Sequence, residues 1–308
     1  MHWQTHLKPE TRCVWPGSCE LGEGVLWVAD EQAVWFVDIL GQRLHRYATL
    51  TNRHDSWLTP ARPGFVARGA PSGMIVGLAK GLYLFSPETK QFELLMPVEL
   101  DRLDNRLNDG IVGPDGALWF GSKNEPENAA SGAWYRWTGA GEAQRFDDGY
   151  VVTNGPAFSL DGCTLYHSDS MGRRILSRSV CAAGRVGENS VFAEIEPGAG
   201  YPDGLAVDSE DCVWVALYAG GALRRYHRDG RCLDVVRLPC ANVTRPSFGG
   251  ADGRTLYVTT ASAGLNEEQR ASQPQAGALL ELRLRVPGPL PRTFELPARE
   301  LADAFKGE

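Results

Sequence analysis

Four oxygen-bearing side chains occur at a common distance ahead of an aromatic residue. Glu23, Asn108, Asn154 and Asp203 stand 11 or 12 residues before Trp35, Trp119, Tyr166 and Trp214, and Pro63 and Arg245 take the corresponding places in two further copies of the pattern. Two carboxylates and two carboxamides on one axis would repel each other unless a cation lay between them, and hard divalent cations prefer such oxygen ligands. The pattern therefore indicates a divalent metal site.

A second interpretation stays open, because residues of this kind also form turns. Asn154-Gly155, Asp203-Gly204 and Asn108-Asp109-Gly110 are common turn sequences. Glu23 argues against turns as the full explanation, since glutamate is a poor turn former and yet has the same offset, between Gly22 and Gly24.

The elements that must position these residues are predicted by an internal repeat. An acidic or glycine-containing turn followed by a short aromatic strand recurs at Trp35, Ile75, Trp119, Tyr166, Trp214 and Tyr257, with steps of 40, 44, 47, 48 and 43 residues. The copy Pro71–Val76 is degenerate. Steps of this size are typical of four-stranded propeller blades. The sequence thus predicts an all-β fold, a six-bladed β-propeller over residues 1–308 as a single domain, with the oxygen ligands at the mouth of the central channel.

A second strand is expected after each copy, where alternating apolar and polar residues follow a turn. These strands begin near Gly41, Gly81, Gly132, Arg174, Gly221 and Gly277. Helical periodicity is confined to Ala298–Phe305, which argues against a helical domain.

Composition and charge limit the partners. The chain has 308 residues, 35 glycines, 43% hydrophobic residues and a net charge of −7, which disfavours nucleic acid and anionic membranes. It shows neither a long apolar run nor a signal pattern, so a cytoplasmic location is expected. Seven cysteines without a Cys-x-x-Cys pair indicate reduced thiols, most of them expected to be buried.

Several sequence motifs resemble those of the senescence-marker-protein/gluconolactonase (regucalcin-like) family, which includes luciferin-regenerating enzymes. The resemblance is carried in order by Leu21–Trp27, Arg106–Gly110, Thr153–Gly162, Pro202–Asp208 and Arg245–Gly250 with Thr255–Thr260. It implies a six-bladed propeller that binds one divalent cation and hydrolyses sugar lactones. Val25 departs from the pattern, because a proline is usual there.

The resemblance also implies roles for individual residues. Glu23, Asn154 and Asp203 match metal ligands, whereas Arg106 and Asn108 match substrate contacts. Zinc, calcium, manganese, magnesium and ferrous iron all suit such a site. Asp203 is in addition the candidate catalytic base, because a carboxylate beside a metal-bound water is within reach of its proton.

Lys123 is a further candidate substrate contact, in a segment where relatives vary. Lys123–Asn128 is predicted to be a polar loop, either over the channel mouth or solvated at the surface. The identity of the lactone, whether glucono-, xylono- or arabinonolactone, and the oligomeric state are not predicted.

Other functions are weighed against a lactonase. A calcium-binding regulatory propeller without turnover and a paraoxonase-like hydrolase of aryl esters or phosphotriesters stay as alternatives. No Gly-x-Ser-x-Gly, His-Glu-x-x-His or Walker-type motif occurs. His167 is expected in a strand rather than in a catalytic dyad, and Asp38 and Asp169 are expected to be acceptors that stabilise blades.

Overall fold

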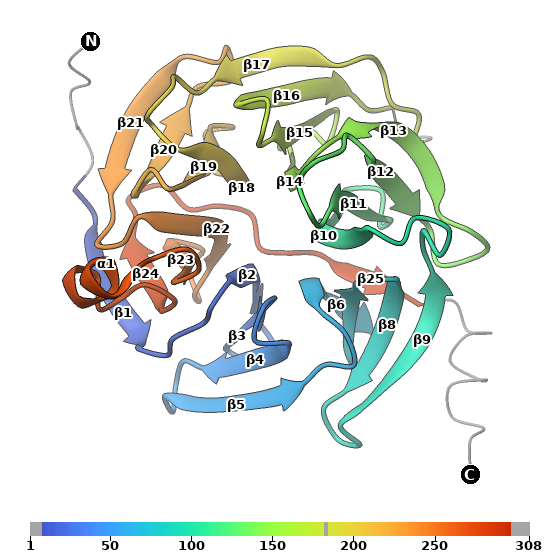
Figure 1. Cartoon of the computed structure of the whole chain (residues 1–308), viewed down its shortest axis with the longest axis horizontal. Coiled ribbons are helices and arrows are strands. Elements are labelled where there is room, and N and C mark those ends of the chain that lie inside the picture. Colours follow the sequence, from blue (N-terminus) through green and yellow to red (C-terminus); the bar gives the residue numbers. More distant parts are fainter. Residues whose placement is uncertain (1–7, 182–183, 297–308) are drawn as a thin grey trace.

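The chain forms six β-sheets, each built on four antiparallel strands, arranged around a central channel (Figure 1). The computed structural model describes residues 8–181 and 184–296. The predicted six-bladed β-propeller is confirmed. The prediction that residues 1–308 form a single domain extends beyond the described residues and stays a prediction, and the predicted helical stretch Ala298–Phe305 lies outside them.

Each blade has four strands that run in sequence from the channel outward, except in the last blade, whose outermost strand is β1. The blades, from inner to outer strand, are: β2 (Gly22–Val28), β3 (Ala33–Asp38), β4 (Arg43–Ala48) and β5 (Arg53–Leu58); β6 (Pro63–Ala70), β7 (Met74–Leu78), β8 (Gly81–Ser86) and β9 (Gln91–Pro97); β10 (Asn105–Val112), β11 (Leu118–Asn124), β12 (Gly132–Trp137) and β13 (Gln144–Tyr150); β14 (Thr153–Phe158), β15 (Thr164–Asp169), β16 (Arg174–Ser179) and β17 (Ser190–Glu194); β18 (Tyr201–Val207), β19 (Val213–Tyr218), β20 (Ala222–Tyr226) and β21 (Cys232–Arg237); β22 (Asn242–Gly249), β23 (Thr255–Ala261), β24 (Leu279–Arg283) and β1 (Glu10–Trp15).

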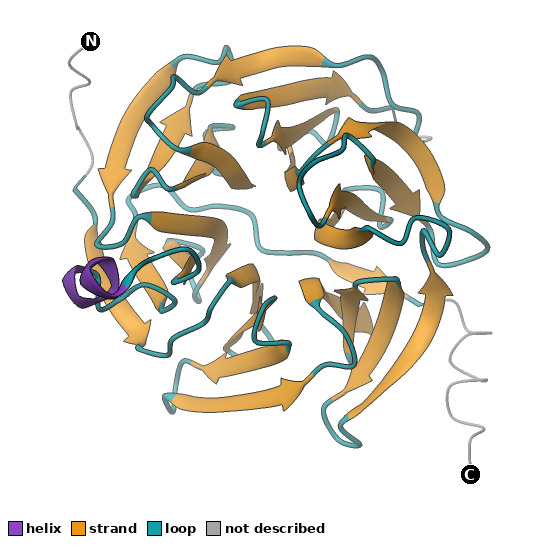
Figure 2. Cartoon of the chain, viewed as in Figure 1, coloured by secondary structure: helices purple, strands orange, loops and turns teal. Residues whose placement is uncertain are grey.

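The remaining elements are a short helix and one extra strand. Helix α1 (Glu267–Ser272) precedes β24, and within the described residues it is the one α-helix (Figure 2). The extra strand, β25 (Thr293–Glu295), pairs in parallel with β6 after the chain has crossed the far side of the channel (Figure 1). No helix in the described part of the chain is long and apolar enough to span a membrane.

The predicted aromatic repeat forms the second strand of each blade, and its acidic turn residue has a structural partner. The Trp214 indole N–H donates to Asp208 Oδ2 (2.9 Å), and Arg225 Nε donates to the same oxygen (2.7 Å). The same three-residue arrangement joins Trp119 and Arg136 to Asp115, and Trp35 and Arg46 to Glu31. The acidic residue therefore ties the turn to two neighbouring strands of its blade.

Asp38 and Asp169 are acceptors within their blades, as expected. Asp38 accepts from the backbone N–H groups of Glu20, Leu21 and Gly41, and Asp169 accepts from Gly172 N–H. His167 lies buried in β15, also as expected, with Nε2 3.0 Å from Asn189 Oδ1.

None of the seven cysteines, all of which lie in the described residues, forms a disulfide. The expectation that most of them are buried is wrong, because only Cys19, Cys212 and Cys240 are. Cys163 and Cys181 are exposed, both in connections between strands of the fourth blade.

Candidate active site

The predicted ring residues lie on the inner strands, each at an irregularity in strand pairing. Pairing with the second strand shifts after Glu23 in β2, between Leu107 and Gly110 in β10, after Asn154 in β14 and after Pro202 in β18. Such bulges re-aim side chains. The alternative that these are ordinary turn residues is wrong, because all four are in strands.

A glycine follows each of the three ligand candidates, and after Glu23 and Asn154 it has a steric reason. Gly24 and Gly155 have φ values of 59° and 58°, a region that favours glycine. A Cβ on Gly155 would lie 2.7 Å from the backbone oxygen of Asp203 in the next blade. The Glu-Gly and Asn-Gly pairs therefore combine a polar side chain with a close approach between neighbouring inner strands.

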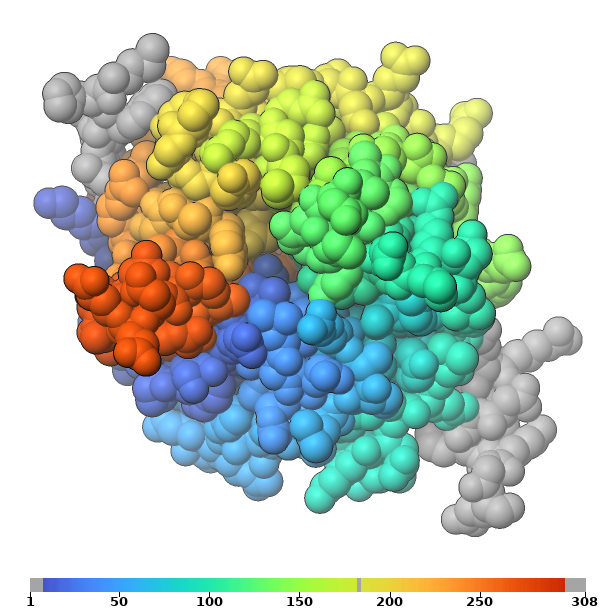
Figure 3. All heavy atoms as spheres, viewed as in Figure 1, coloured from blue at the N-terminus to red at the C-terminus, as the bar shows by residue number. Residues whose placement is uncertain are grey.

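All six predicted site residues border one cavity of about 310 Å³. They are Glu23, Arg106, Asn108, Lys123, Asn154 and Asp203, and each is buried. Figure 3 shows the hollow near the middle of the face presented in Figure 1, beside the green loop that follows β11. The structure thus brings together residues that lie far apart in the chain, from Glu23 to Asp203.

A chain of hydrogen bonds orders the amide side chains of the cavity. Arg106 Nη1 donates to Asn108 Oδ1 (2.7 Å), and Asn108 Nδ2 donates to Asn154 Oδ1 (2.6 Å). Asn154 Nδ2 donates to Ser170 Oγ (3.0 Å), which donates to the backbone oxygen of Pro202 (2.7 Å). Asn154 therefore presents its carbonyl oxygen on the side of the cavity that faces Asn108.

The two buried carboxyl groups, Glu23 and Asp203, strongly disfavour carrying charge together. Burial and the neighbouring Glu23 carboxylate raise the pKa of Asp203 well above its ordinary value. Burial also raises the pKa of Glu23, although the Gly24 N–H and the Arg245 charge oppose this. Asp203 Oδ1 is buried without a hydrogen-bond partner. An isolated acceptor of this kind is costly unless a ligand or ion meets it.

The cationic side chains around the cavity are already paired with other acids. Arg106 pairs with Glu125 and Lys123 with Glu127, and Arg245, whose charge acts on Glu23, pairs with Asp109. Within the described residues, neither Glu23 nor Asp203 forms an ion pair with a side chain. This donor set of two carboxylates and one amide oxygen therefore fits a divalent cation.

Lys123 differs from its sequence prediction. It lies in strand β11 rather than in a loop, and its side chain is 8% exposed. Burial lowers the pKa of Lys123, and so does the Arg106 charge. The ion pair with Glu127 opposes this effect and compensates for the burial. The expected loop begins only after Asn124, the last residue of β11.

Some cavity-lining residues missed from the sequence share a second repeat position with Lys123. Ile39, Lys123, Ser170 and Tyr218 each follow the aromatic residue of their blade by four positions, and all line the cavity. A residue four positions after the aromatic residue lies at the channel-mouth end of the second strand. A residue 11 or 12 positions before the aromatic residue lies on the inner strand. Glu127 lacks such a signal, because it lies in the loop after β11.

Comparison with known proteins identifies relatives over nearly the whole chain. The model of the SMP-30/gluconolactonase/LRE-like region matches residues 21–262. The 6-deoxy-6-sulfogluconolactonase of Pseudomonas putida is 33% identical over 278 residues, covering 90% of this chain and 96% of that protein. The L-arabinolactonase of Azospirillum brasilense is 33% identical over 273 residues, covering 87% and 90%.

A solved structure agrees in fold. The crystal structure of regucalcin from Agrobacterium tumefaciens, described as a calcium-binding protein, superposes with a TM-score of 0.89 at 28% identity, covering 94% of this chain and 98% of that one. Match length, motif order and six-bladed architecture thus lead to one conclusion: the chain belongs to the SMP-30/gluconolactonase/LRE-like family.

Proposed function

We propose that this chain is a lactonase that opens sugar lactones to sugar acids with the help of one divalent cation held by Glu23, Asn154 and Asp203. The observation that carries the proposal is the buried Glu23–Asp203 carboxyl pair, with the unpartnered Asp203 Oδ1, at the wall of a 310 Å³ cavity. The lactonases among the relatives support the substrate class.

The cation and the chain would divide the work. When bound, a divalent cation supplies Lewis-acid polarisation of an ester carbonyl and stabilises the negative charge that develops there. Asp203 takes the proton of the attacking water at a carboxylate oxygen. Water adds to the carbonyl carbon, the ring C–O bond breaks, and the departing ring oxygen receives a proton, which yields a hydroxy acid.

Substrate orientation falls to the basic and amide side chains of the cavity. Arg106 and Asn108 lie on β10, and Lys123 lies opposite Arg106 on β11. Their N–H groups and the Asn108 carbonyl suit the hydroxyl groups of a sugar ring, which both donate and accept. Glu125 and Glu127 neutralise Arg106 and Lys123, so the pocket fits a polyhydroxylated ring of low net charge.

The test is proton release from a panel of aldonolactones, with spontaneous opening in buffer as the control. We expect opening faster than in buffer with at least one of magnesium, manganese, calcium, zinc or ferrous iron, and little turnover of an aryl ester. A calcium-binding propeller without turnover is the second candidate, since the regucalcin structure is described as calcium-binding. Binding of calcium without acceleration of any lactone would favour that candidate.

A further inference from the structure

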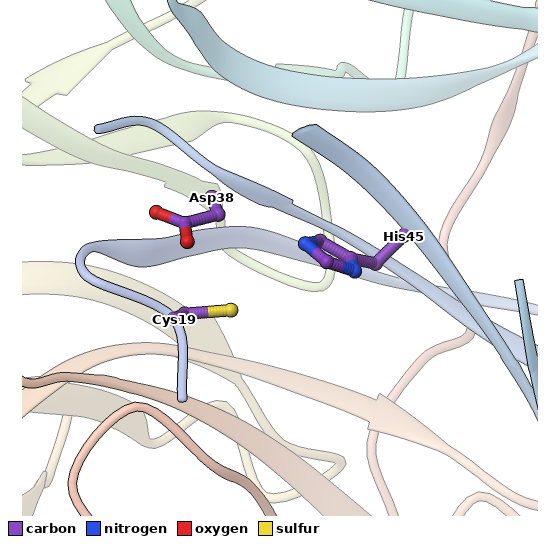
Figure 4. A group of neighbouring side chains, drawn as sticks. All are labelled: Cys19, Asp38 and His45. Atoms are coloured by element: carbon purple, nitrogen blue, oxygen red, sulfur yellow. The ribbon is translucent and has the colours of Figure 1, made fainter. Parts of the chain in front are cut away.

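A second group of metal-ligand side chains lies outside the cavity. Cys19 belongs to the linker between β1 and β2, Asp38 ends β3, and His45 lies in β4. One ligand atom from each lies within 4.8 Å of those of the other two, and all three residues are buried, with exposed fractions of 2, 6 and 4%. Figure 4 shows the three side chains as neighbours.

The space between them is not bridged by hydrogen bonds. His45 Nε2 is buried and has no hydrogen-bond partner, and no hydrogen bond of the structure joins any two of the three side chains. A buried imidazole nitrogen normally has a partner, because its desolvation is otherwise uncompensated. This unpartnered nitrogen is the independent sign that the group is incomplete without a ligand.

The donor set identifies the class of ligand. A thiolate, an imidazole nitrogen and a carboxylate oxygen are the three kinds of donor that zinc takes in proteins, whereas calcium and magnesium prefer oxygen alone. A cysteine thiolate and an aspartate carboxylate also neutralise the charge of a divalent ion. Three protein donors leave one position of a tetrahedral ion for a water molecule.

The side chains are held by further contacts that suit ligands. His45 Nδ1 lies 2.9 Å from His54 Nε2, which fixes the ring and leaves Nε2 for the ion. Asp38 Oδ2 accepts one backbone N–H, from Glu20, and Oδ1 accepts two, from Leu21 and Gly41. Partners of this kind orient ligands and tune their basicity.

We propose that Cys19, Asp38 and His45 form a structural zinc site that is separate from the channel site. Its place in the fold gives it a role. Cys19 lies where the chain leaves the last blade for the first: its N–H donates to Gly277 O (2.9 Å), and Ser262 Oγ donates to its carbonyl (3.1 Å). Zinc would join this linker to β3 and β4 of the first blade. It would thereby secure the closure of the propeller four residues before Glu23.

The proposal is tested by cobalt substitution of the whole chain, followed in the near-ultraviolet. Cobalt at an all-oxygen channel site gives no sulfur-to-cobalt charge-transfer band, whereas cobalt bound by Cys19 does. We expect the band in the wild-type chain, in Asp203→Ala and in Cys163→Ser, which removes an exposed thiol. We expect its loss in Cys19→Ser and a clear weakening in His45→Gln.

Zinc content provides the second measurement. The Asp203→Ala chain should retain one tightly bound zinc ion per chain after gel filtration, and Asp203→Ala/His45→Gln should retain none. His45→Gln keeps the thiol, so it tests the site even if Cys19→Ser does not fold. Two results would overturn the proposal. One is absence of the band from the wild-type chain, and the other is a band in His45→Gln and in Cys19→Ser that is as strong as the wild-type band. Failure of the channel site to bind metal would leave the band unchanged.

Discussion

Arg106 donates a hydrogen bond to the Asn108 side chain in the cavity. None of its hydrogen bonds reaches Glu23 or Asp203. It is buried and borders the cavity, and its guanidinium group is held by Glu125 and Asn108. A cation there is placed to serve a substrate rather than a metal, since it would repel the ion directly.

Replacement of Arg106 by methionine should therefore lower kcat/KM for the preferred lactone by roughly two- to a hundredfold, the range for one or two lost hydrogen bonds in the transition state. The content of channel metal should stay unchanged. Arg62→Met is the matched control, because Arg62 pairs with the same Glu125 but does not line the cavity. Steady-state kinetics with metal analysis decide the matter. Loss of the metal in Arg106→Met would contradict the assignment.

At the scale of the element, the acidic turn residue of a blade is a buried acceptor of several hydrogen bonds. Asp208 is fully buried and accepts from Glu210 and Cys212 N–H, from the Trp214 indole and from Arg225. Asp208→Ala should lower the free energy of unfolding by about 3–5 kcal/mol, because it leaves the Arg225 charge buried without this partner. Urea denaturation measures the effect.

Asp252 provides the control for that experiment. It has the equivalent turn position in the last blade and pairs with Arg283, but both side chains are about half exposed. Exposed pairs contribute about 0–1 kcal/mol. Equal destabilisation by Asp252→Ala and Asp208→Ala would show that burial of the acidic turn residue does not add to its contribution to stability.

His167 makes the free energy of unfolding depend on pH. Burial lowers its pKa from the ordinary 6.5 to about 4. Between these values the unfolded chain binds a proton that the folded chain does not, so the free energy of unfolding falls as the pH falls through 6.5 and levels off below about 4. The His167 contribution amounts to about 3 kcal/mol.

A series of urea denaturation curves between pH 7 and pH 4 tests this sign. His167→Gln should show a flatter dependence than the wild-type chain. A steeper fall of stability in His167→Gln than in the wild-type chain would refute the explanation.

Strands with strong local signals were predictable. The second strand of each blade has its aromatic residue and acidic turn, and the third has its alternation; both patterns report buried packing directly. Lys123 was misplaced because Lys, Asn, Glu and Pro are typical of loops, whereas the ion pair with Glu127 that lets Lys123 extend a buried strand is a tertiary contact. The Cys19, Asp38 and His45 cluster was missed for the same reason.

At the scale of the molecule, closure and covering of the channel come from the two ends of the described chain. Strand β1 completes the last blade, and the segment after β24 crosses the far side of the channel to reach β6 (Figure 1). No copy of the repeat covers this C-terminal segment, so its position could not be predicted from the sequence. Phe294 in β25 is 1% exposed and stacks on Trp137 of β12, with ring centroids 5.2 Å apart.

Phe294→Ala should consequently destabilise the chain by about 3–5 kcal/mol, as for other buried aromatic residues. Leu290→Ala, in the same segment but 43% exposed, should have a small effect. Thermal and urea unfolding provide the comparison. Similar stabilities for Phe294→Ala and the wild-type chain would show that the segment is not needed to secure the second and third blades.

The binding of one cation by Glu23, Asn154 and Asp203, which come from three different blades, is the central claim. It is tested most directly by returning manganese to the metal-free chain while lactone opening is recorded. Manganese prefers oxygen donors and so addresses the channel rather than the cysteine-containing site. We predict that the rate is lost on chelation and returns in proportion to bound manganese, reaching its plateau at one ion per chain. Asp203→Ala should neither bind that ion nor recover. Undiminished turnover by the metal-free chain, or normal manganese binding by Asp203→Ala, would contradict the account.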